Sequence, residues 1–283
     1  MTSLLPFHWH AVELAVIVAV LLVHRRAVST FRERRLALLA LVSLAVVVAW
    51  PIGDLAASVS ISVATAQRLV IMLLVAPLLL MSLPTSLLVR LTRPAPIDAM
   101  MRVVAHPGAA IALVTVVGTA TLSAQAVDWG ARSTLGRDVV LLVVLAVGVV
   151  LWIPALGAMP GTKHLSPMAR AGYVFGSALV VTSFSFVWIF ARHPLYVELR
   201  HQHALLGMTA LFDQQLAGFV AKFGAYVPMW AVSFTIFSRA EERGLPVEET
   251  PLHWADVERA ILRVDRQRVR EVIRRRPGRE GSG

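Results

Sequence analysis

Seven long apolar stretches, separated by shorter polar connections, dominate the pattern of this chain. They run from His8 to Val23, Leu36 to Ile52, Ile61 to Leu83, Gly108 to Val127, Asp138 to Gly157, Arg170 to Phe190 and Asp213 to Phe237. A hydrocarbon core about 30 Å thick requires about 20 apolar residues per helix, and no alternation typical of a membrane β-barrel competes with this pattern. The sequence therefore predicts an all-α polytopic membrane protein with a bundle of seven transmembrane helices.

The arginines and lysines of the connections predict the orientation of this bundle. The connections after the first, third and fifth stretches, together with the tail after Ser238, carry most of these residues. The connections on the opposite side carry few. Because strongly basic connections stay on the cytoplasmic side of a membrane, we expect the N-terminus outside and the C-terminus in the cytoplasm.

Composition supports a membrane protein and narrows the choice of partners. The chain is 57% hydrophobic and 16% charged, with a mean hydropathy of +0.70, whereas soluble domains are about 25% charged. The net charge of +10 is concentrated in connections and tail, which favours anionic lipid headgroups over nucleic acid. The absence of cysteine excludes disulfides, thiolate metal sites and cysteine nucleophiles.

Two parts of the chain differ in character. Residues 1–240 form the predicted seven-helix transmembrane domain, and residues 241–283 form a basic cytoplasmic tail. Between Pro251 and Pro277, apolar residues recur at steps of three and four among many arginines, which predicts an amphipathic helix. We expect this helix to lie on anionic lipid; docking on the cytoplasmic surface of a partner protein is the alternative.

Two local features predict how the helices are shaped and packed. Pro77 lies within the third apolar stretch and is expected to kink its helix. Gly172 and Gly176 form a small-xxx-small pair, which is typical of close packing between membrane helices.

Polar side chains interrupt several apolar stretches near their predicted outer ends. These residues are Glu13, Gln67, Arg68, Asp138, Asp213, Gln214, Gln215 and Lys222. With a rise of 1.5 Å per residue, Arg68 and Lys222 should lie roughly 10 to 14 Å below the outer boundary. A buried cation there needs an anion or water. We therefore expect a polar intramembrane cluster around one outward cavity, with Asp54 as a further candidate counter-ion.

Two of these residues have alternative interpretations. Asp213 precedes an apolar run and could cap its own helix, although this would leave Gln214 and Gln215 unexplained. Lys222 shares a helix face with Gln215 and Tyr226, and we expect this face to point into the bundle. The alternative is that the lysine extends toward the outer interface.

Histidines suggest a metal site on the outer side. The pairs are His8 with His10 and His201 with His203, and Met208 follows the second pair. Imidazole suits copper or zinc and a thioether suits Cu(I), so these five residues predict a copper site. Interfacial histidines that bind no metal are the alternative. Because no nucleophile elbow, phosphate-binding loop or His-Glu-x-x-His motif is present, we do not expect an enzyme.

Four short motifs carry a resemblance to a known family. They are Asp213-Gln214-Gln215-Leu216-Ala217-Gly218, the segment His193 to Tyr196, Ala76-Pro77-Leu78-Leu79-Leu80 with Pro84, and Trp152-x-Pro154. Together they resemble the CtaG type of cytochrome c oxidase assembly factor, a bacterial seven-helix membrane protein, over residues 8–240. The resemblance implies a multi-pass protein of the bacterial plasma membrane that helps mature haem-copper oxidase by handling copper outside. Oxidase subunits or other copper chaperones would be its partners.

The chain departs from this family at two places. Members usually carry His-x-x-Gln-His early in the third helix, whereas here Ala64 and Arg68 stand around Gln67. Members also tend to carry Glu-His at the start of the fifth helix, where this chain has Arg137-Asp138. We hypothesise that Arg68 and Asp138 form a buried ion pair in the space of a metal, which predicts no copper there.

Three functions remain open at this point. The leading hypothesis is a membrane assembly factor or chaperone for oxidase biogenesis, with a metal-independent paralogue as one form of it. The alternative is a small copper or solute transporter. Its polar pathway would have to continue to the inner side, yet the inner halves of the helices carry almost no ionisable groups, which argues against transport. A weaker third is a membrane enzyme acting on lipid or haem, with Asp213 and Lys222 as acid and base.

Overall fold

The computed structural model describes residues 11–26, 30–49, 51–157, 165–196 and 207–242. The chain divides into two compact units, Met1–Ala240 and Glu241–Gly283. All regular elements among the described residues are helical, as predicted. Only Glu241 and Glu242 of the second unit are described, so the predicted amphipathic tail helix lies outside the described residues.

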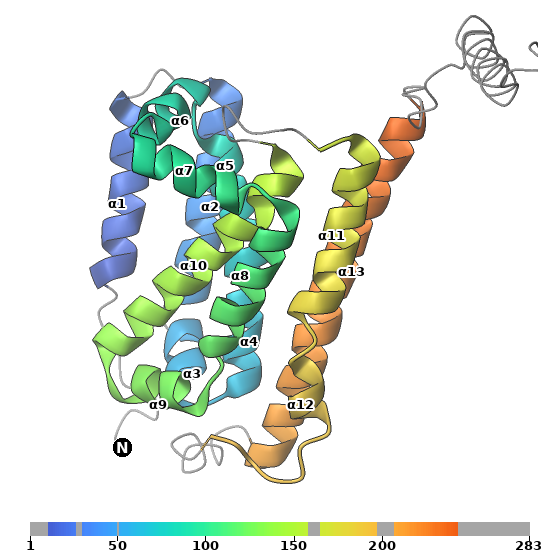
Figure 1. Ribbon diagram of the computed structural model, residues 1–283. Helices are drawn as coiled ribbons and strands as arrows, with labels where there is room; N and C mark the ends of the chain where they lie inside the picture. The colour runs from blue at the N-terminus through green and yellow to red at the C-terminus, as the bar shows by residue number, and fades with distance from the viewer. Residues whose placement is uncertain (1–10, 27–29, 50, 158–164, 197–206, 243–283) are drawn as a thin grey trace, which may run out of the picture. The chain divides into compact units, whose positions relative to one another are not determined.

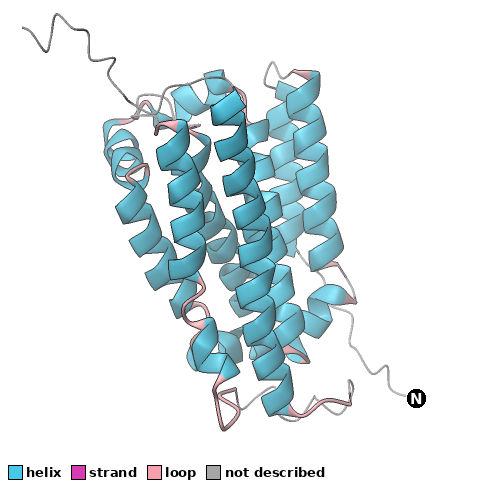
Figure 2. Ribbon diagram, turned by 90° about the vertical axis from the view of Figure 1, so that its right-hand side faces the viewer, coloured by secondary structure: helices cyan, strands magenta, loops and turns pink. Residues whose placement is uncertain are grey.

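The helices follow one another along the chain as Figure 1 shows. They are α1 (Ala11–Arg26), α2 (Phe31–Val48), α3 (Ile52–Ser58), α4 (Ile61–Val70), the π-helix η1 (Ile71–Val75), α5 (Ala76–Ser82), α6 (Thr85–Thr92), α7 (Ala95–Val104), α8 (Pro107–Ala120), α9 (Ala124–Arg132), α10 (Thr134–Leu156), α11 (Pro167–Val181), α12 (Ser185–Ile189) and α13 (Ala210–Glu242). Figure 2 shows the longer helices of the first unit running side by side, with loops gathered at their ends.

Four helical stretches of the described chain are long and apolar enough to cross a membrane. They are Ile61–Ser82, Thr134–Leu156, Pro167–Ile189 and Ala210–Glu242. The pair α7 and α8, bent by 89°, would make a fifth if it forms one span. The first two predicted stretches correspond to α1, with 16 residues, and α2, which starts with four charged residues in its first turns. The count of seven spans and the orientation stay predictions.

Two predicted stretches are broken in the structure. The fourth was expected to continue to Val127 but ends as α8 at Ala120, and the sixth divides into α11 and α12. At these breaks the Oγ1 hydroxyls of Thr121 and Thr182 donate to backbone carbonyls three and four residues earlier, at 2.6 and 2.7 Å. Such bonds compete with the regular backbone pattern. The predicted extent of the fourth stretch is therefore wrong, whereas the sixth still forms one candidate span, Pro167–Ile189, with an interruption inside it.

Pro77 has no backbone N–H, so one hydrogen bond of its helix is missing. The segment before it, η1, is π-helical, and the Ala76 N–H donates to the Ile71 carbonyl. In this register the next N–H would come from Pro77, which has none, so the Met72 carbonyl is left for another donor. The indole Nε1 of Trp152 on α10 donates to it at 2.9 Å. The segment before Pro77 is therefore π-helical and bound by α10, and the kink stays a prediction.

α10 packs against α5, η1, α8, α9 and α11 and connects the apolar core. One cluster joins it to α8 and α11 around Leu151 and Trp152, and another joins it to α2 and η1 around Val144. The close approach to η1 requires a glycine at position 148. A Cβ on Gly148 would lie only 2.9 Å from the Cα of Met72 in η1 and 2.8 Å from the Cβ of Ala76 at the start of α5.

Gly172 and Gly176 do not make the predicted packing contact. A Cβ added to either glycine would meet no atom of the described chain within 4 Å. The small-xxx-small prediction is therefore wrong within this chain, because close packing would leave no such space beside α11.

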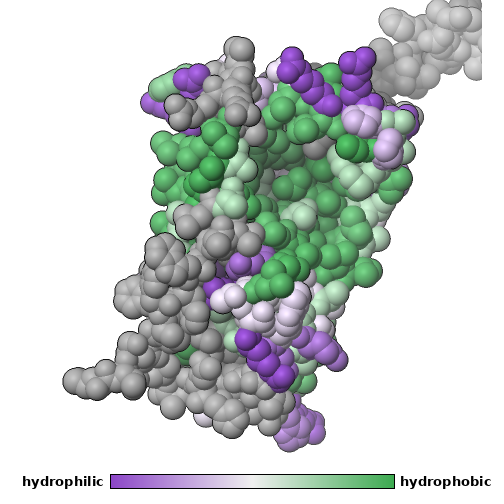
Figure 3. All heavy atoms as spheres, turned by 90° about the vertical axis from the view of Figure 1, so that its left-hand side faces the viewer, coloured by the Kyte–Doolittle hydropathy of each residue, from purple (hydrophilic) through white to green (hydrophobic). Residues whose placement is uncertain are grey.

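Large apolar side chains remain exposed on the outer faces of the helices. Val116 on α8 and Val227 and Phe234 on α13 are each more than half exposed. Figure 3 shows an apolar band on one face of the first unit, with hydrophilic side chains gathered at both of its ends. So much exposed apolar surface is unfavourable in water and supports a position within a lipid bilayer.

Candidate functional site

The carboxylate of Asp213 is fully buried and holds the start of α4. It accepts hydrogen bonds from the N–H of Ile61 at 2.7 Å and the N–H of Ser62 at 3.3 Å. The hydroxyls of Ser60 and Ser62 also donate to it. The first N–H groups of a helix have no partner within the helix and form the positive end of its dipole. Asp213 therefore ties α13 to the positive end of α4.

Asp213 does not cap its own helix. α13 begins at Ala210, and the residue before it, Thr209, serves that helix instead. The Oγ1 of Thr209 accepts from the Phe212 N–H at 3.2 Å, and its carbonyl accepts from the Asp213 N–H at 3.0 Å. The alternative interpretation, in which Asp213 caps the helix that contains it, is wrong.

The two glutamines that follow Asp213 hold the connection between α12 and α13. Oε1 of Gln214 accepts from the Leu195 N–H at 2.8 Å, and Nε2 of Gln215 donates to the Ala191 carbonyl at 3.3 Å. Gln214 is only 1% exposed. Asp213 thus binds the start of α4 while both glutamines bind the connection before α13, which explains why three polar side chains stand in a row.

Tyr196 binds the same connection to the end of α8. Its hydroxyl donates to the Leu122 carbonyl at 2.8 Å, and its ring lies edge-on to Trp188 with ring centroids 6.0 Å apart. Burial raises the pKa of Tyr196 above its ordinary value, because the phenolate would lose its hydration. The hydroxyl therefore stays protonated and remains a donor.

The guanidinium of Arg137 lies between two carboxylates at the start of α10. Its Nη1 is 3.4 Å from Oδ1 of Asp54 on α3, and its Nε is 3.9 Å from Oδ1 of Asp138. All three residues are buried. No ion pair among the described residues joins Arg68 to Asp138, so that hypothesis is wrong. Arg137 is the cation nearest to Asp138 because it lies on the same helical turn.

Lys222 is buried against a hydroxyl and two aromatic rings. Its Nζ donates to Oγ1 of Thr182 at 3.3 Å and lies 4.3 Å from the ring centroids of both Phe186 and Tyr226. The faces of aromatic rings attract cations. Because Lys222 is only 8% exposed, the alternative in which it extends to an interface is wrong.

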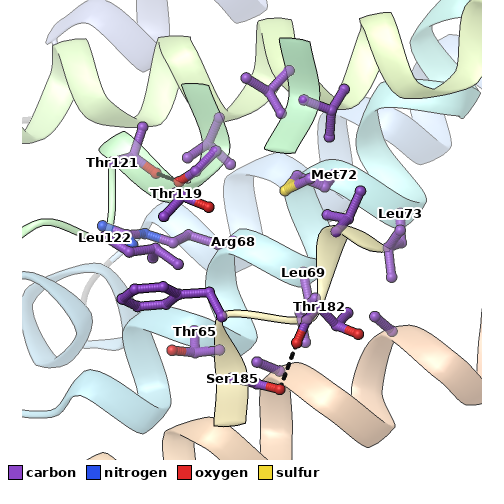
Figure 4. A pocket seen from close by; sticks show the side chains of 18 of the residues that line it. Thr65, Arg68, Leu69, Met72, Leu73, Thr119, Thr121, Leu122, Thr182 and Ser185 are labelled. Carbon is purple, nitrogen blue, oxygen red and sulfur yellow. Dashed lines mark hydrogen bonds between the residues drawn. The ribbon is translucent and has the colours of Figure 1, made fainter. Parts of the chain in front are cut away.

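A cavity of about 90 Å³ lies between α4, η1, α8, α10, α11, α12 and α13. Its wall is mostly apolar, and its polar side chains are Thr65, Arg68, Thr119, Thr121, Thr182 and Ser185. Figure 4 shows Arg68 extending from α4 along this wall toward Leu122. Its Nη1 is buried and has no hydrogen-bond partner among the described residues. The cavity thus combines an apolar wall with one guanidinium.

A second, smaller cavity of about 40 Å³ also has Arg68 in its wall. Arg137 and Gln67 line it as well. Nε2 of Gln67 donates to the Val47 carbonyl on α2 at 2.8 Å, so this glutamine holds α4 against α2. The guanidinium of Arg68 therefore faces two cavities.

The predicted polar cluster is distributed over separate places. Arg68 lines the large cavity, whereas Asp138 lines a different one beside α1 and α2. Asp213 lies at the start of α4, and Lys222 lies between aromatic rings. The side chain of Glu13 is outside the described residues. The expectation of one cavity shared by these charges is therefore not met.

Most of the predicted metal ligands cannot be located. His8, His10, His201 and His203 lie outside the described residues, and Met208 is partly exposed. In the described ranges, no three histidine, aspartate or glutamate side chains come together as a metal ion would require. The outer copper site stays a prediction.

Sequence reasoning missed two residues of this region that carry buried contacts, Arg137 and Tyr196. Arg137 was named only as part of a departure from the family pattern, although its neighbour Asp138 signalled an ion pair. Ser60 and Ser62, which stand just before and within the start of an apolar stretch, were also missed. Such serines are typical of helix N-termini and could have pointed to a helix start that an anion stabilises.

Comparison with known proteins gives one match. The family model described as cytochrome c oxidase caa3 assembly factor (Caa3_CtaG) matches residues 15–242, which is most of the chain. No curated protein and no solved structure shows a significant match.

Proposed function

Because the chain belongs to the cytochrome c oxidase caa3 assembly factor family, we propose that it works as a membrane chaperone for oxidase biogenesis that needs no metal inside its helical bundle. The family match confirms the resemblance carried by the sequence motifs. The more specific claim, that no metal binds inside the helical bundle, rests on one residue.

That residue is Arg68, whose guanidinium lines the main cavity. The resemblance implies an imidazole at this position and another at Ala64, which has no ligand atom. A guanidinium is charged at all physiological pH values, and a Cu(I) ion about 4 Å away would be repelled by roughly 4 kcal/mol at an effective dielectric constant of about 20. The cavity therefore disfavours copper.

Copper handling, if the chain performs it, then belongs to residues outside the bundle. The candidates are His8, His10, His201, His203 and Met208, on the side predicted to be outside. In this proposal the protein lies in the bacterial plasma membrane and meets oxidase subunits or other copper chaperones there. The basic tail would meet anionic lipid.

Deletion of the gene, with oxidase activity and copper content measured together, tests the proposal. We expect deletion to lower oxidase activity and the wild-type chain to restore it. A His201→Ala, His203→Ala double variant should restore protein level but not copper loading. Arg68→Gln serves as a matched variant within the bundle: it removes the cation but supplies no imidazole, and Ala64 has no ligand atom, so the metal content of the purified chain should stay unchanged.

Three outcomes would count against it. Intact oxidase after deletion would refute the role in assembly. Stoichiometric copper that persists without the four outer histidines would refute a metal-free bundle. Altered cellular copper with normal oxidase would favour the transporter alternative.

A further inference from the structure

The lining of the cavity beside Arg68 is typical of a site that binds an amphiphilic ligand. Apolar residues from seven helical elements surround it, among them Leu69, Val114, Leu151 and Met229. The cavity has a volume of about 90 Å³. Apolar pockets with a few placed polar groups are typical of small-molecule sites. The lining therefore suits an apolar ligand with one charged group.

Arg68 supplies the group that would orient such a ligand. Its Nη1 is enclosed and has no hydrogen-bond partner among the described residues, although a buried donor without a partner is costly. A guanidinium presents parallel N–H groups that match a carboxylate or a phosphate. An anionic headgroup at Arg68 would satisfy the enclosed donor and balance its charge.

The two cations that are buried as whole residues in the described chain, Arg137 and Lys222, have partners. Arg137 lies within ion-pair distance of Asp54 and Asp138. Lys222 contacts a hydroxyl and two aromatic rings. Arg68 differs from both because it faces open cavity space without a carboxylate of its own.

We propose that this cavity binds an amphiphilic anion, with a carboxylate or phosphate headgroup at Arg68 and one acyl chain along the apolar wall. The ligand comes either from free fatty acids or from anionic phospholipids of the bilayer, because both carry this combination of groups. The site does not depend on copper handling or on the role in oxidase assembly.

Binding of radiolabelled laurate to the full chain in phosphatidylcholine nanodiscs tests this site. We expect saturable binding to the wild type and at least about tenfold weaker binding to Arg68→Gln, because a charge-assisted pair is lost. Ala225→Leu, which fills the cavity, should also weaken binding. Lys222→Gln is the matched control that removes a buried cation outside this wall, and it should bind as the wild type does.

Two further ligands test the role of the charge and the source of the natural ligand. Lauryl alcohol has the same chain without the charge and should bind to the wild type and to Arg68→Gln with equal affinity. Phosphatidylglycerol added to the nanodiscs displaces laurate if the natural ligand is a bilayer lipid and leaves it bound if the ligand is a free fatty acid. If Arg68→Gln fails to fold, Arg68→Lys keeps the charge and should bind with intermediate affinity.

The proposal is overturned if the wild type shows no saturable laurate binding. It is also overturned if Arg68→Gln, folded as judged by its thermal melt, binds laurate as tightly as the wild type. Loss of binding in Lys222→Gln to the same degree would assign the effect to general electrostatics and overturn the site as well. Oxidase activity is a separate readout, so failure here leaves the proposed function standing.

Discussion

Replacing Asp213 by alanine should destabilise the bundle far more than loss of an ordinary helix cap. The carboxylate is fully buried and accepts from two backbone N–H groups, of Ile61 and Ser62, and from two serine hydroxyls. Asp213→Ala leaves both N–H groups buried and without their acceptor. The start of α4 then loses the anion that stabilises its dipole.

The magnitude follows from these contacts. An unsatisfied buried donor costs about 1 to 3 kcal/mol, and two backbone donors are orphaned while the hydroxyls can rotate to other acceptors. We therefore expect a loss of about 3 to 5 kcal/mol in the free energy of unfolding, in line with the removal of one partner from a buried charged network. A simple N-cap is worth only about 1 kcal/mol.

Thr209→Ala is the matched control because Thr209 caps the helix that contains Asp213. Unfolding of both variants by SDS in mixed micelles gives the two free energies, and hydrogen exchange reports the Ile61 and Ser62 amides directly. We expect faster exchange of these amides only in Asp213→Ala. If Asp213→Ala costs no more than Thr209→Ala, the carboxylate does not hold α4 and the reasoning fails.

Three further predictions concern packing and protonation. Trp152→Phe should lose about 1 kcal/mol of stability, because its indole no longer donates to the carbonyl freed by the π-helix. Trp230→Phe, whose indole Nε1 has no such partner in the described chain, should lose less from hydrogen bonding. Gly148→Ala should cost about 1 to 3 kcal/mol by overpacking, whereas Gly118→Ala should be nearly neutral because its nearest contact is 3.8 Å away. Thermal stability should fall as pH rises above about 10, because the raised pKa of Tyr196 lets the folded state keep a proton that the unfolded state releases.

Each of these has a result that contradicts it. Equal losses in the two tryptophan variants would remove the case for the indole to carbonyl bond. A neutral Gly148→Ala would mean that α10 can move away from η1 at no cost. For the tyrosine, the comparison is between the wild type and Tyr196→Phe: an identical decline above about pH 10 in both would assign the effect to other groups.

Much of the architecture could be predicted from the order of residues alone. Apolar stretches such as Ile61 to Leu83 and Asp138 to Gly157 become helices because a backbone removed from water must satisfy its own hydrogen bonds. Four short motifs, among them Asp-Gln-Gln at Asp213, together predicted the family, which the match over residues 15–242 confirms. Both inferences need only local sequence, because burial of a stretch and the identity of a motif do not depend on what lies opposite.

The partners of the buried polar groups were decided by the tertiary structure. The sequence placed Arg68 and Asp138 at plausible depths, yet Asp138 lies nearest Arg137, and Arg68 faces a cavity. Asp213 appeared to cap its own helix but binds the start of another, about 150 residues earlier in the chain. Each residue turns a helix by about 100°, so a small change in rotation or depth sends a side chain to a different neighbour. A one-dimensional pattern shows which segments leave water, but the rotation of each helix about its axis is set only when all of them pack together.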